Sequence, residues 1–130
     1  MSREEPIWSD GPPAFSFLVD PCGFEGPETT SDGLRYRRGD LTVEVSSWSR
    51  HHEAGFDTIV AVEARGDEPR RSASLDSLYV ACGLGPAQDV PTGGGSRATI
   101  RKRIDQHSRA LRALMPHLDG PDLPELLRRC

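Results

Sequence analysis

The stretch LRYRRGDLTVEVSSW, residues 34 to 48, decides the fold. Apolar residues recur at every second position on both sides of Gly39, and these are Leu34, Tyr36, Leu41, Val43 and Val45. An apolar residue at every second position is typical of a strand with one buried face. The segment Arg38–Gly39–Asp40 between the two runs predicts a tight turn. The stretch is therefore expected to form an antiparallel hairpin.

A third strand is predicted in FDTIVAVEAR, residues 56 to 65. Its apolar residues occupy both faces of such a strand: Phe56, Val60 and Val62 lie on one face, and Ile59 and Ala61 lie on the other. Apolar residues on both faces favour an interior strand, or one partly covered by a helix. Strands that follow one another through short turns pair antiparallel, because parallel neighbours need a long crossover.

The segments around the strands are expected to be helical. The strongest pattern is RATIRKRIDQHSRALRALMPHL, residues 97 to 118, in which His107 fills one slot of an apolar stripe formed by Ile100, Ile104, Leu111, Leu114 and Leu118. Spacings of three and four residues indicate an amphipathic helix. Shorter helices are predicted at 13–20, after Ser74 and within 119–129. The fold class is α+β: a small antiparallel sheet of three or more strands packed against two to four helices.

The size and composition indicate one domain. The 130 residues suffice for a single core, and residues 1–12, which are charged and rich in Pro and Gly, are expected to form a flexible arm before a domain at 13–130. Fifteen Arg against one Lys suggest a GC-rich bacterial genome. Three dispersed cysteines with no CxxC pair favour reduced thiols in the cytoplasm. Neither a signal peptide nor a membrane span is predicted.

The net charge of −4 hides an asymmetry along the chain. Residues 1–95 hold eight basic and sixteen acidic side chains, whereas residues 96–130 hold eight basic and four acidic ones. The acidic part could steer a basic partner toward the protein. Alternatively, the two parts attract one another within the fold.

The densest group of reactive side chains is His51–His52–Glu53. Adjacent residues of a strand point to opposite faces, so the two imidazoles cannot easily hold one metal ion, and the HExxH spacing of a helical zinc site is absent. An exposed hairpin loop is the preferred interpretation, with no metal and no cofactor. A small enzyme or a metal-binding protein that uses this group is the alternative. As a partner-binding surface, the sequence favours Glu44, Trp48, His51, His52 and Glu53, with Trp48 as an anchor or as a core residue.

Other candidate sites have less support. The glycines at 93–95 lack the GxxxxGK[ST] spacing of a phosphate loop, GxSxG is absent, and no two carboxylates are paired by spacing, so no catalytic residue is assigned. A basic helix face could bind nucleic acid as part of a regulatory module, and it consists of Arg101, Lys102, Arg109 and Arg112. The acidic pI of about 5.5 argues against that function.

The segment FSFLVDPCGF, residues 15 to 24, resembles the F-L-x-x-x-x-G-F opening of a group of small bacterial α+β proteins. The resemblance continues through the strands and the long helix to about residue 127. Some members of that group resemble immunity proteins of polymorphic toxins, which implies toxin binding and attaches no catalytic residue to the pattern. The sequence therefore predicts a cytoplasmic, non-enzymatic protein that binds another protein, with a basic toxin as the expected partner and no membrane contact.

Overall fold

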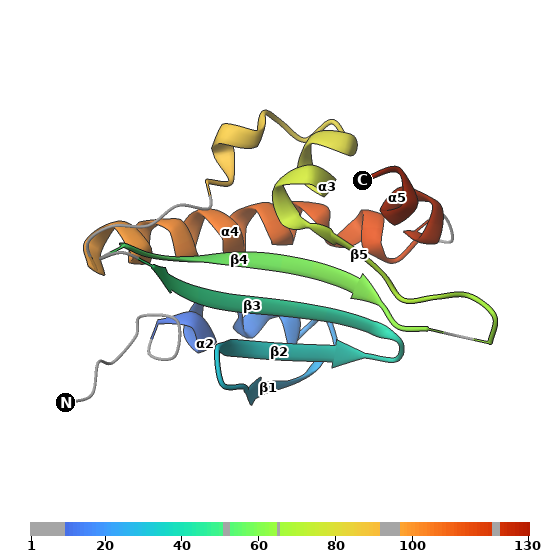
Figure 1. Ribbon diagram of the computed structural model, residues 1–130, viewed down its shortest axis with the longest axis horizontal. Coiled ribbons are helices and arrows are strands. Elements are labelled where there is room, and N and C mark those ends of the chain that lie inside the picture. The colour runs from blue at the N-terminus through green and yellow to red at the C-terminus, as the bar shows by residue number, and fades with distance from the viewer. Residues whose placement is uncertain (1–9, 51–52, 65, 92–96, 121–122) are drawn as a thin grey trace.

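A computed structural model of the chain describes residues 10–50, 53–64, 66–91, 97–120 and 123–130. The β-strands form one antiparallel sheet in which each strand pairs with the next along the chain (Figure 1). Their bounds are β1 Glu25–Thr29, β2 Gly33–Arg38, β3 Leu41–Arg50, β4 Glu53–Val62 and β5 Arg71–Ser74. The predicted α+β class with an antiparallel sheet is confirmed, and β4 is an interior strand.

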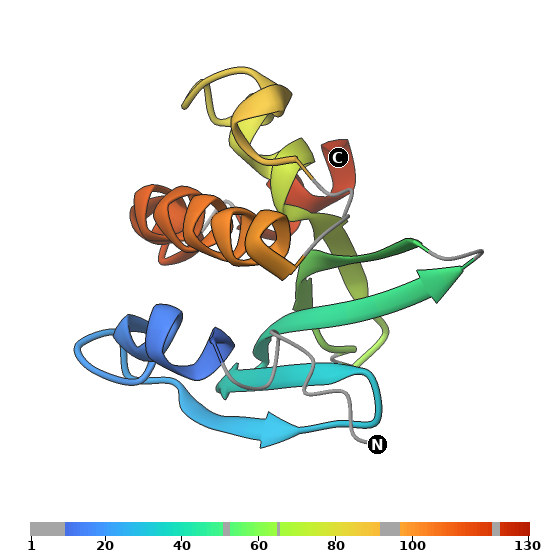
Figure 2. The same ribbon diagram turned by 90° about the vertical axis from the view of Figure 1, so that its left-hand side faces the viewer.

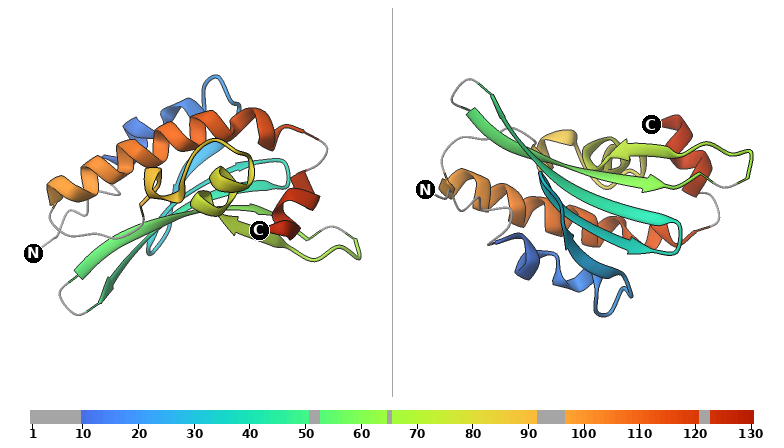
Figure 3. Two further views of the ribbon diagram at one scale, coloured as in Figure 1. Left: turned by 90° about the horizontal axis from the view of Figure 1, so that it is seen from above. Right: turned by 60° about the horizontal axis from the view of Figure 1, so that its bottom comes forward.

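The described helices lie against one face of this sheet, and none of them covers the other face, which we call the open face (Figures 2 and 3). They are the short α2 (Gly11–Ala14), the 3₁₀ turn η1 (Ser16–Leu18), α3 (Leu75–Ala81), the 3₁₀ turn η2 (Ala87–Asp89), α4 (Arg97–Leu118) and α5 (Leu123–Arg129). The longest of them, α4, matches the predicted amphipathic helix at both ends. The described elements therefore form two layers, and one face of the sheet carries no described helix.

The β2–β3 hairpin forms as its alternation predicts. Tyr36 pairs with Val43, and Val43 pairs in turn with Val60 of β4, so apolar residues of three strands line up on one face. Gly39 turns the chain with φ of 64°, a left-handed conformation that residues with a Cβ atom rarely adopt. The turn therefore fixes the register that places every second side chain of the hairpin in the core.

The core lies between the sheet and the helices. Tyr36, Val43 and Val60 are each 0 % exposed, and burial raises the pKa of the Tyr36 hydroxyl to about 12, because its ionised form would lie among apolar groups. Helix α4 buries the stripe that the sequence predicts: Ile100, Ile104, His107, Leu111, Leu114 and Leu118. The periodicity of the helix and that of the strands thus point to the same core.

His107 is the polar residue at the centre of this core. Its Nε2 lies 2.7 Å from the carbonyl oxygen of Pro91, which can only accept, so Nε2 carries the hydrogen. Its Nδ1 then accepts from the Thr58 hydroxyl at 2.9 Å, and its ring packs on that of Phe56 with centroids 4.6 Å apart. Burial lowers the pKa of His107, so the neutral ring ties β4 to α4.

The structure departs from the prediction at the sheet edges. The sequence predicts three strands explicitly within a sheet of three or more, and the structure adds β1 and β5 in residues 25–33 and 66–74, so the sheet has five strands. All five residues of β1 are exposed, and β5 buries only Ala73, so neither strand has apolar alternation. Their backbones pair with a neighbouring strand although their side chains carry no core pattern.

The N-terminal segment also differs from the prediction. The expected helix at 13–20 is split into α2 and η1, and η1 contributes Phe17 and Leu18 to the core. Residues 10–12, the end of the expected flexible arm, lie at the start of α2. Asp10 occupies its N-cap position without a side-chain capping bond and Gly11 is buried in its first turn, whereas residues 1–9 lie outside the described part of the chain.

Candidate functional site

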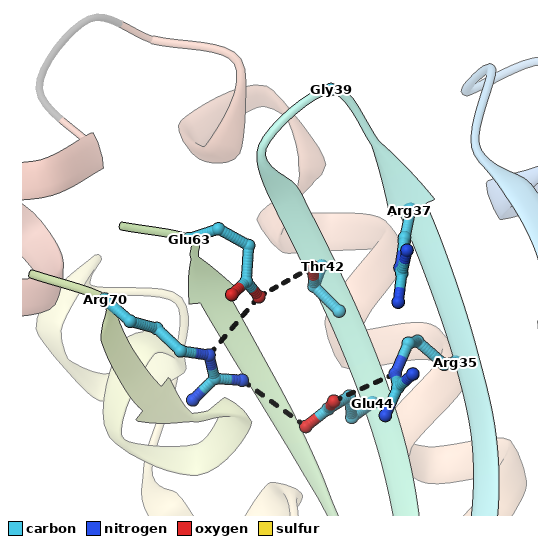
Figure 4. Close-up of a pocket in the computed structure, with 7 residues that line it drawn as sticks. All are labelled: Arg35, Arg37, Gly39, Thr42, Glu44, Glu63 and Arg70. Carbon is cyan, nitrogen blue, oxygen red and sulfur yellow. Dashed lines mark hydrogen bonds and ion pairs between the residues drawn. The ribbon is translucent and has the colours of Figure 1, made fainter. Parts of the chain in front are cut away.

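The open face of the sheet carries charged side chains. Core-facing residues alternate along β2 and β3, so the residues between them, such as Arg35 and Arg37 of β2 and Glu44 of β3, point away from the helices (Figure 4). We call this group the charged ladder and define it as Glu28, Arg35, Arg37, Glu44, Glu63 and Arg70. It extends from the edge strand β1 to the segment that precedes β5.

Glu44 occupies the middle of the charged ladder. Its Oε2 accepts from Nε of Arg35 at 3.1 Å, and its Oε1 lies 3.5 Å from a terminal nitrogen of Arg70. Arg35 is its cross-strand partner in the β2–β3 register, whereas Arg70 reaches it from beyond β4 (Figure 4). The two guanidinium groups hold this carboxylate from opposite sides, and its side chain stays 26 % exposed.

Arg70 also links Glu44 to Glu63. Its Nε lies 3.3 Å from Oε2 of Glu63, and the Thr42 hydroxyl donates to the same oxygen at 3.2 Å. Thr42 is 2 % exposed and Ala61 is 0 % exposed, although no described helix lies on this face of the sheet. The long side chains of the charged ladder lie over these small residues and bury them. The charged ladder thus shields this part of β3 and β4 from water.

Glu28 closes the ladder on the side of β1. A single oxygen, Oε1, lies 3.5 Å from Arg35 and 3.7 Å from Arg37, and the side chains of Glu28 and Arg37 are both 57 % exposed. These distances exceed the ~2.7–2.9 Å of a strong charge-assisted hydrogen bond. The outermost link is therefore the loosest one.

Between these side chains the open face is hollowed by a depression of about 390 Å³. Seven residues line it: Arg35, Arg37, Gly39, Thr42, Glu44, Glu63 and Arg70 (Figure 4). The lining contains three guanidinium groups and two carboxylates but neither a histidine nor a cysteine. Such a surface can bind polar and charged groups, and its two carboxylates, Glu44 and Glu63, are already paired with arginines.

Of the five residues that the sequence favours for partner contact, only Glu44 has a side chain in the described part of the structure. Glu44 belongs to the charged ladder. Glu53 begins β4 opposite Arg50, six residues further along β3, which is roughly 20 Å at ~3.3 Å per residue. Trp48 pairs with Gly55 in the same register. The pair His51–His52 lies outside the described residues, as do the side chains of Trp48 and Glu53.

The alternative basic surface lies on the exposed side of α4. Arg101 is paired with Asp10 at 2.8 Å and Arg109 with Asp105 at 3.0 Å. The guanidinium of Arg112 lies 4.3 Å from the ring centre of Phe17, and Lys102 is exposed beside them. At least three of the four cations therefore already contact neighbouring side chains. Of the two expectations for the charge asymmetry, the Asp10–Arg101 pair fits attraction within the fold.

Within the described ranges, no three His, Cys, Asp or Glu side chains are grouped so that they could hold a metal ion. Of the three cysteines, Cys22 and Cys82 are partly buried and Cys130 is exposed. None of the described helices is both long and apolar enough to cross a membrane.

Most of the charged ladder was missed from the sequence. Arg35 and Arg37 alternate with Leu34 and Tyr36, which was a visible signal for the open face. Glu63 directly follows β4, and the β3–β4 pairing places it beside Thr42, whereas Arg70 comes beside Glu44 only when β5 pairs with β4. No family model, curated protein or solved structure matched the chain. Its function must therefore be argued from its own residues and geometry.

Proposed function

We propose that the chain is a non-enzymatic protein-binding domain whose binding surface is the open face of the sheet. The observation that supports this most is an uncovered sheet face on which charged side chains are already held by one another, with Glu44 bound by both Arg35 and Arg70. Side chains that are ordered before binding lose less conformational entropy when a partner docks. The depression among them gives that partner a concave surface to fill.

The partner that fits best is a toxin that the domain neutralises in the cytoplasm. The resemblance over residues 15–127 supports this role, since it implies toxin binding without a catalytic residue. The acidic excess of residues 1–95 would speed the approach of a basic toxin over long range. At short range the charged ladder offers three Arg and three Glu, so it selects a partner with a matching pattern of both signs.

The two alternatives have less support. A metal-dependent or enzymatic site would have to be built on His51, His52 and Glu53, which lie outside the part of the chain whose side chains are described. Binding of nucleic acid through α4 would have to compete with the pairs that Arg101 and Arg109 already form. The open face is therefore the surface on which the experiment should be made.

The test is co-purification from the cells that produce the protein. Ile59→Arg places a long cation in the middle of the open face, and Ala113→Arg places the same cation on the exposed surface of α4 as a matched control. We expect a protein to co-purify stoichiometrically with the wild type and with Ala113→Arg, and to be lost with Ile59→Arg. Circular dichroism shows whether both variants are folded.

Two results would contradict the proposal. One is the loss of the co-purifying protein in both folded variants, because its binding would then not depend on the open face. The other is a wild-type chain that carries no stoichiometric partner under any growth condition in which it is produced.

A further inference from the structure

Arg35 and Arg37 present two guanidinium groups on the same side of β2, and Thr42 of β3 lies beside them (Figure 4). Arg35 uses its Nε to donate to Glu44, which leaves its terminal nitrogens on the side of β1. Arg37 has its terminal nitrogen 3.7 Å from Glu28 and lies at the rim of the depression. Together they form a pair of planar donors suited to a carboxylate.

Glu28 holds this position weakly in the free protein. Only one of its oxygens contacts the two arginines, at 3.5 and 3.7 Å, so it does not form the paired short bonds that a guanidinium can make with a carboxylate. It also lies on an edge strand whose five residues are all exposed, and the pairing of β1 with β2 is irregular between Glu25 and Glu28. A competing carboxylate has little binding energy to overcome there.

We propose that Arg35 and Arg37 form a carboxylate-binding fork that Glu28 occupies in the free protein and that an Asp or Glu side chain of the partner protein occupies in the complex. This inference rests on the proposed function, because it names the chemistry of the group that docks on the open face. When Glu28 leaves, the depression retains three guanidinium groups against the carboxylates of Glu44 and Glu63. The resulting net positive charge selects an anion.

The geometry favours one carboxylate over a larger anion. Glu44 lies beside Arg35, between Arg35 and Arg70, and would repel additional negative charge brought into the depression (Figure 4). Glu28 itself is the stand-in that the fork already accepts, and it is a carboxylate. An acidic side chain of an otherwise basic toxin would thus fit both the long-range and the short-range charges of this protein.

The test uses a tetrapeptide of four glutamates with blocked ends as the probe, and binding is followed by the Nε–Hε signals of the arginines in nuclear magnetic resonance spectra. Glu28→Gln frees the fork without changing its shape, and we expect the peptide to bind this variant about 2- to 5-fold more tightly than the wild type, the range of a weak surface pair. Arg37→Gln removes one arm of the fork, and we expect it to weaken peptide binding by a factor of at least about 2 to 5 relative to the wild type.

The controls separate the fork from general attraction. Arg128→Gln removes an equally exposed arginine from α5, where it pairs with Glu125, and should leave the affinity unchanged. A tetrapeptide of four glutamines should not shift the Arg35 and Arg37 signals. Inorganic phosphate is titrated in parallel, to show whether the fork discriminates between anions.

Several outcomes would overturn the inference. One is that Glu28→Gln does not raise the affinity for the peptide. Another is that Arg128→Gln lowers this affinity as much as Arg37→Gln does. A third is that phosphate binds and the peptide does not. A partner that is captured through the open face but is indifferent to Arg37→Gln would disprove the fork and leave the proposed function standing. Binding of the peptide to the fork without any captured partner would support the fork and contradict the proposed function.

Discussion

The two faces of the sheet are made by the same strands and differ in nearly every physical respect. On the core face, Tyr36 and Val60 have no exposed surface and pack against the helices. On the open face, Arg35 and Ile59 are half-buried, and the contacts between side chains are mainly ion pairs in reach of water. Burial of apolar area stabilises a fold far more than exposed ion pairs do. The open face is therefore free to vary for binding without loss of the fold.

The largest expected effect compares two residues of β4. Phe56→Ala removes a buried ring that packs on His107, and it should lower the free energy of unfolding by about 3–5 kcal/mol. Ile59→Ala on the open face should cost less than about 1.5 kcal/mol, because Ile59 is only half-buried and leaves no closed cavity. Urea unfolding of both variants measures the difference, and equal losses would contradict the assignment of the faces.

The next comparison uses two threonines that are equally buried. Thr58→Val removes the donor to Nδ1 of His107 and leaves that nitrogen unsatisfied in the core, at a cost of about 1–3 kcal/mol. Thr42→Val removes a donor to Glu63, whose carboxylate is 47 % exposed and can turn to water, so the cost should stay below about 0.5 kcal/mol. In chemical denaturation, Thr58→Val should lower the free energy of unfolding more than Thr42→Val does. The reverse order would contradict the hydrogen bond from Thr58 to the buried His107.

The pH dependence of stability should follow His107. Burial lowers its pKa, a trend that Arg103 reinforces and that the Pro91 carbonyl and Asp76 oppose. Because the pKa is depressed in the folded state, the unfolded chain binds the proton first, and stability is lost as the pH falls below about 6.5. His107→Leu should flatten this loss between pH 6.5 and 5. A wild-type stability that is constant over that range would refute the buried neutral histidine.

The smallest effect is expected on the charged ladder. Glu44→Gln weakens the pairs with Arg35 and Arg70, yet these groups are a quarter or more exposed, so the loss should stay within about 0.5–1 kcal/mol. High salt should reduce the difference from wild type further, because it screens exposed pairs. Thermal unfolding at low and high salt checks this. A loss like that of Phe56→Ala would mean that the open face is in fact part of the core.

The two faces also differ in how well the sequence predicts them. Alternation in residues 34–48 and the stripe of α4 predict the core face, because nearly all of these core positions carry an apolar side chain, with His107 as the exception in the stripe. The strands β1 and β5 escape prediction because the backbone forms them while their side chains stay outside the core. Periodicity detects burial, so it cannot detect an edge strand that buries almost nothing.

For the candidate site, Glu44 and the arginines of β2 could be placed on the open face by parity alone. Arg70 could not, because it lies in a polar segment and reaches Glu44 only when β5 pairs with β4. Glu28 was hidden for the same reason, since β1 was not expected. The charged ladder combines residues of β1, β2 and β3 with Glu63 and Arg70 from the segment between β4 and β5, so it depends on strand order, which is a long-range property that local patterns do not contain.

Thiol labelling of two adjacent positions of β4 tests most directly whether one face of this sheet is closed and the other open. Ile59→Cys and Val60→Cys are labelled under native conditions, and peptide mass identifies the modified site separately from the three native cysteines. Ile59→Cys should react at least ~100-fold faster, because Val60 is fully buried and becomes accessible only when the core opens. Equal rates, or a protected Ile59→Cys, would contradict the account.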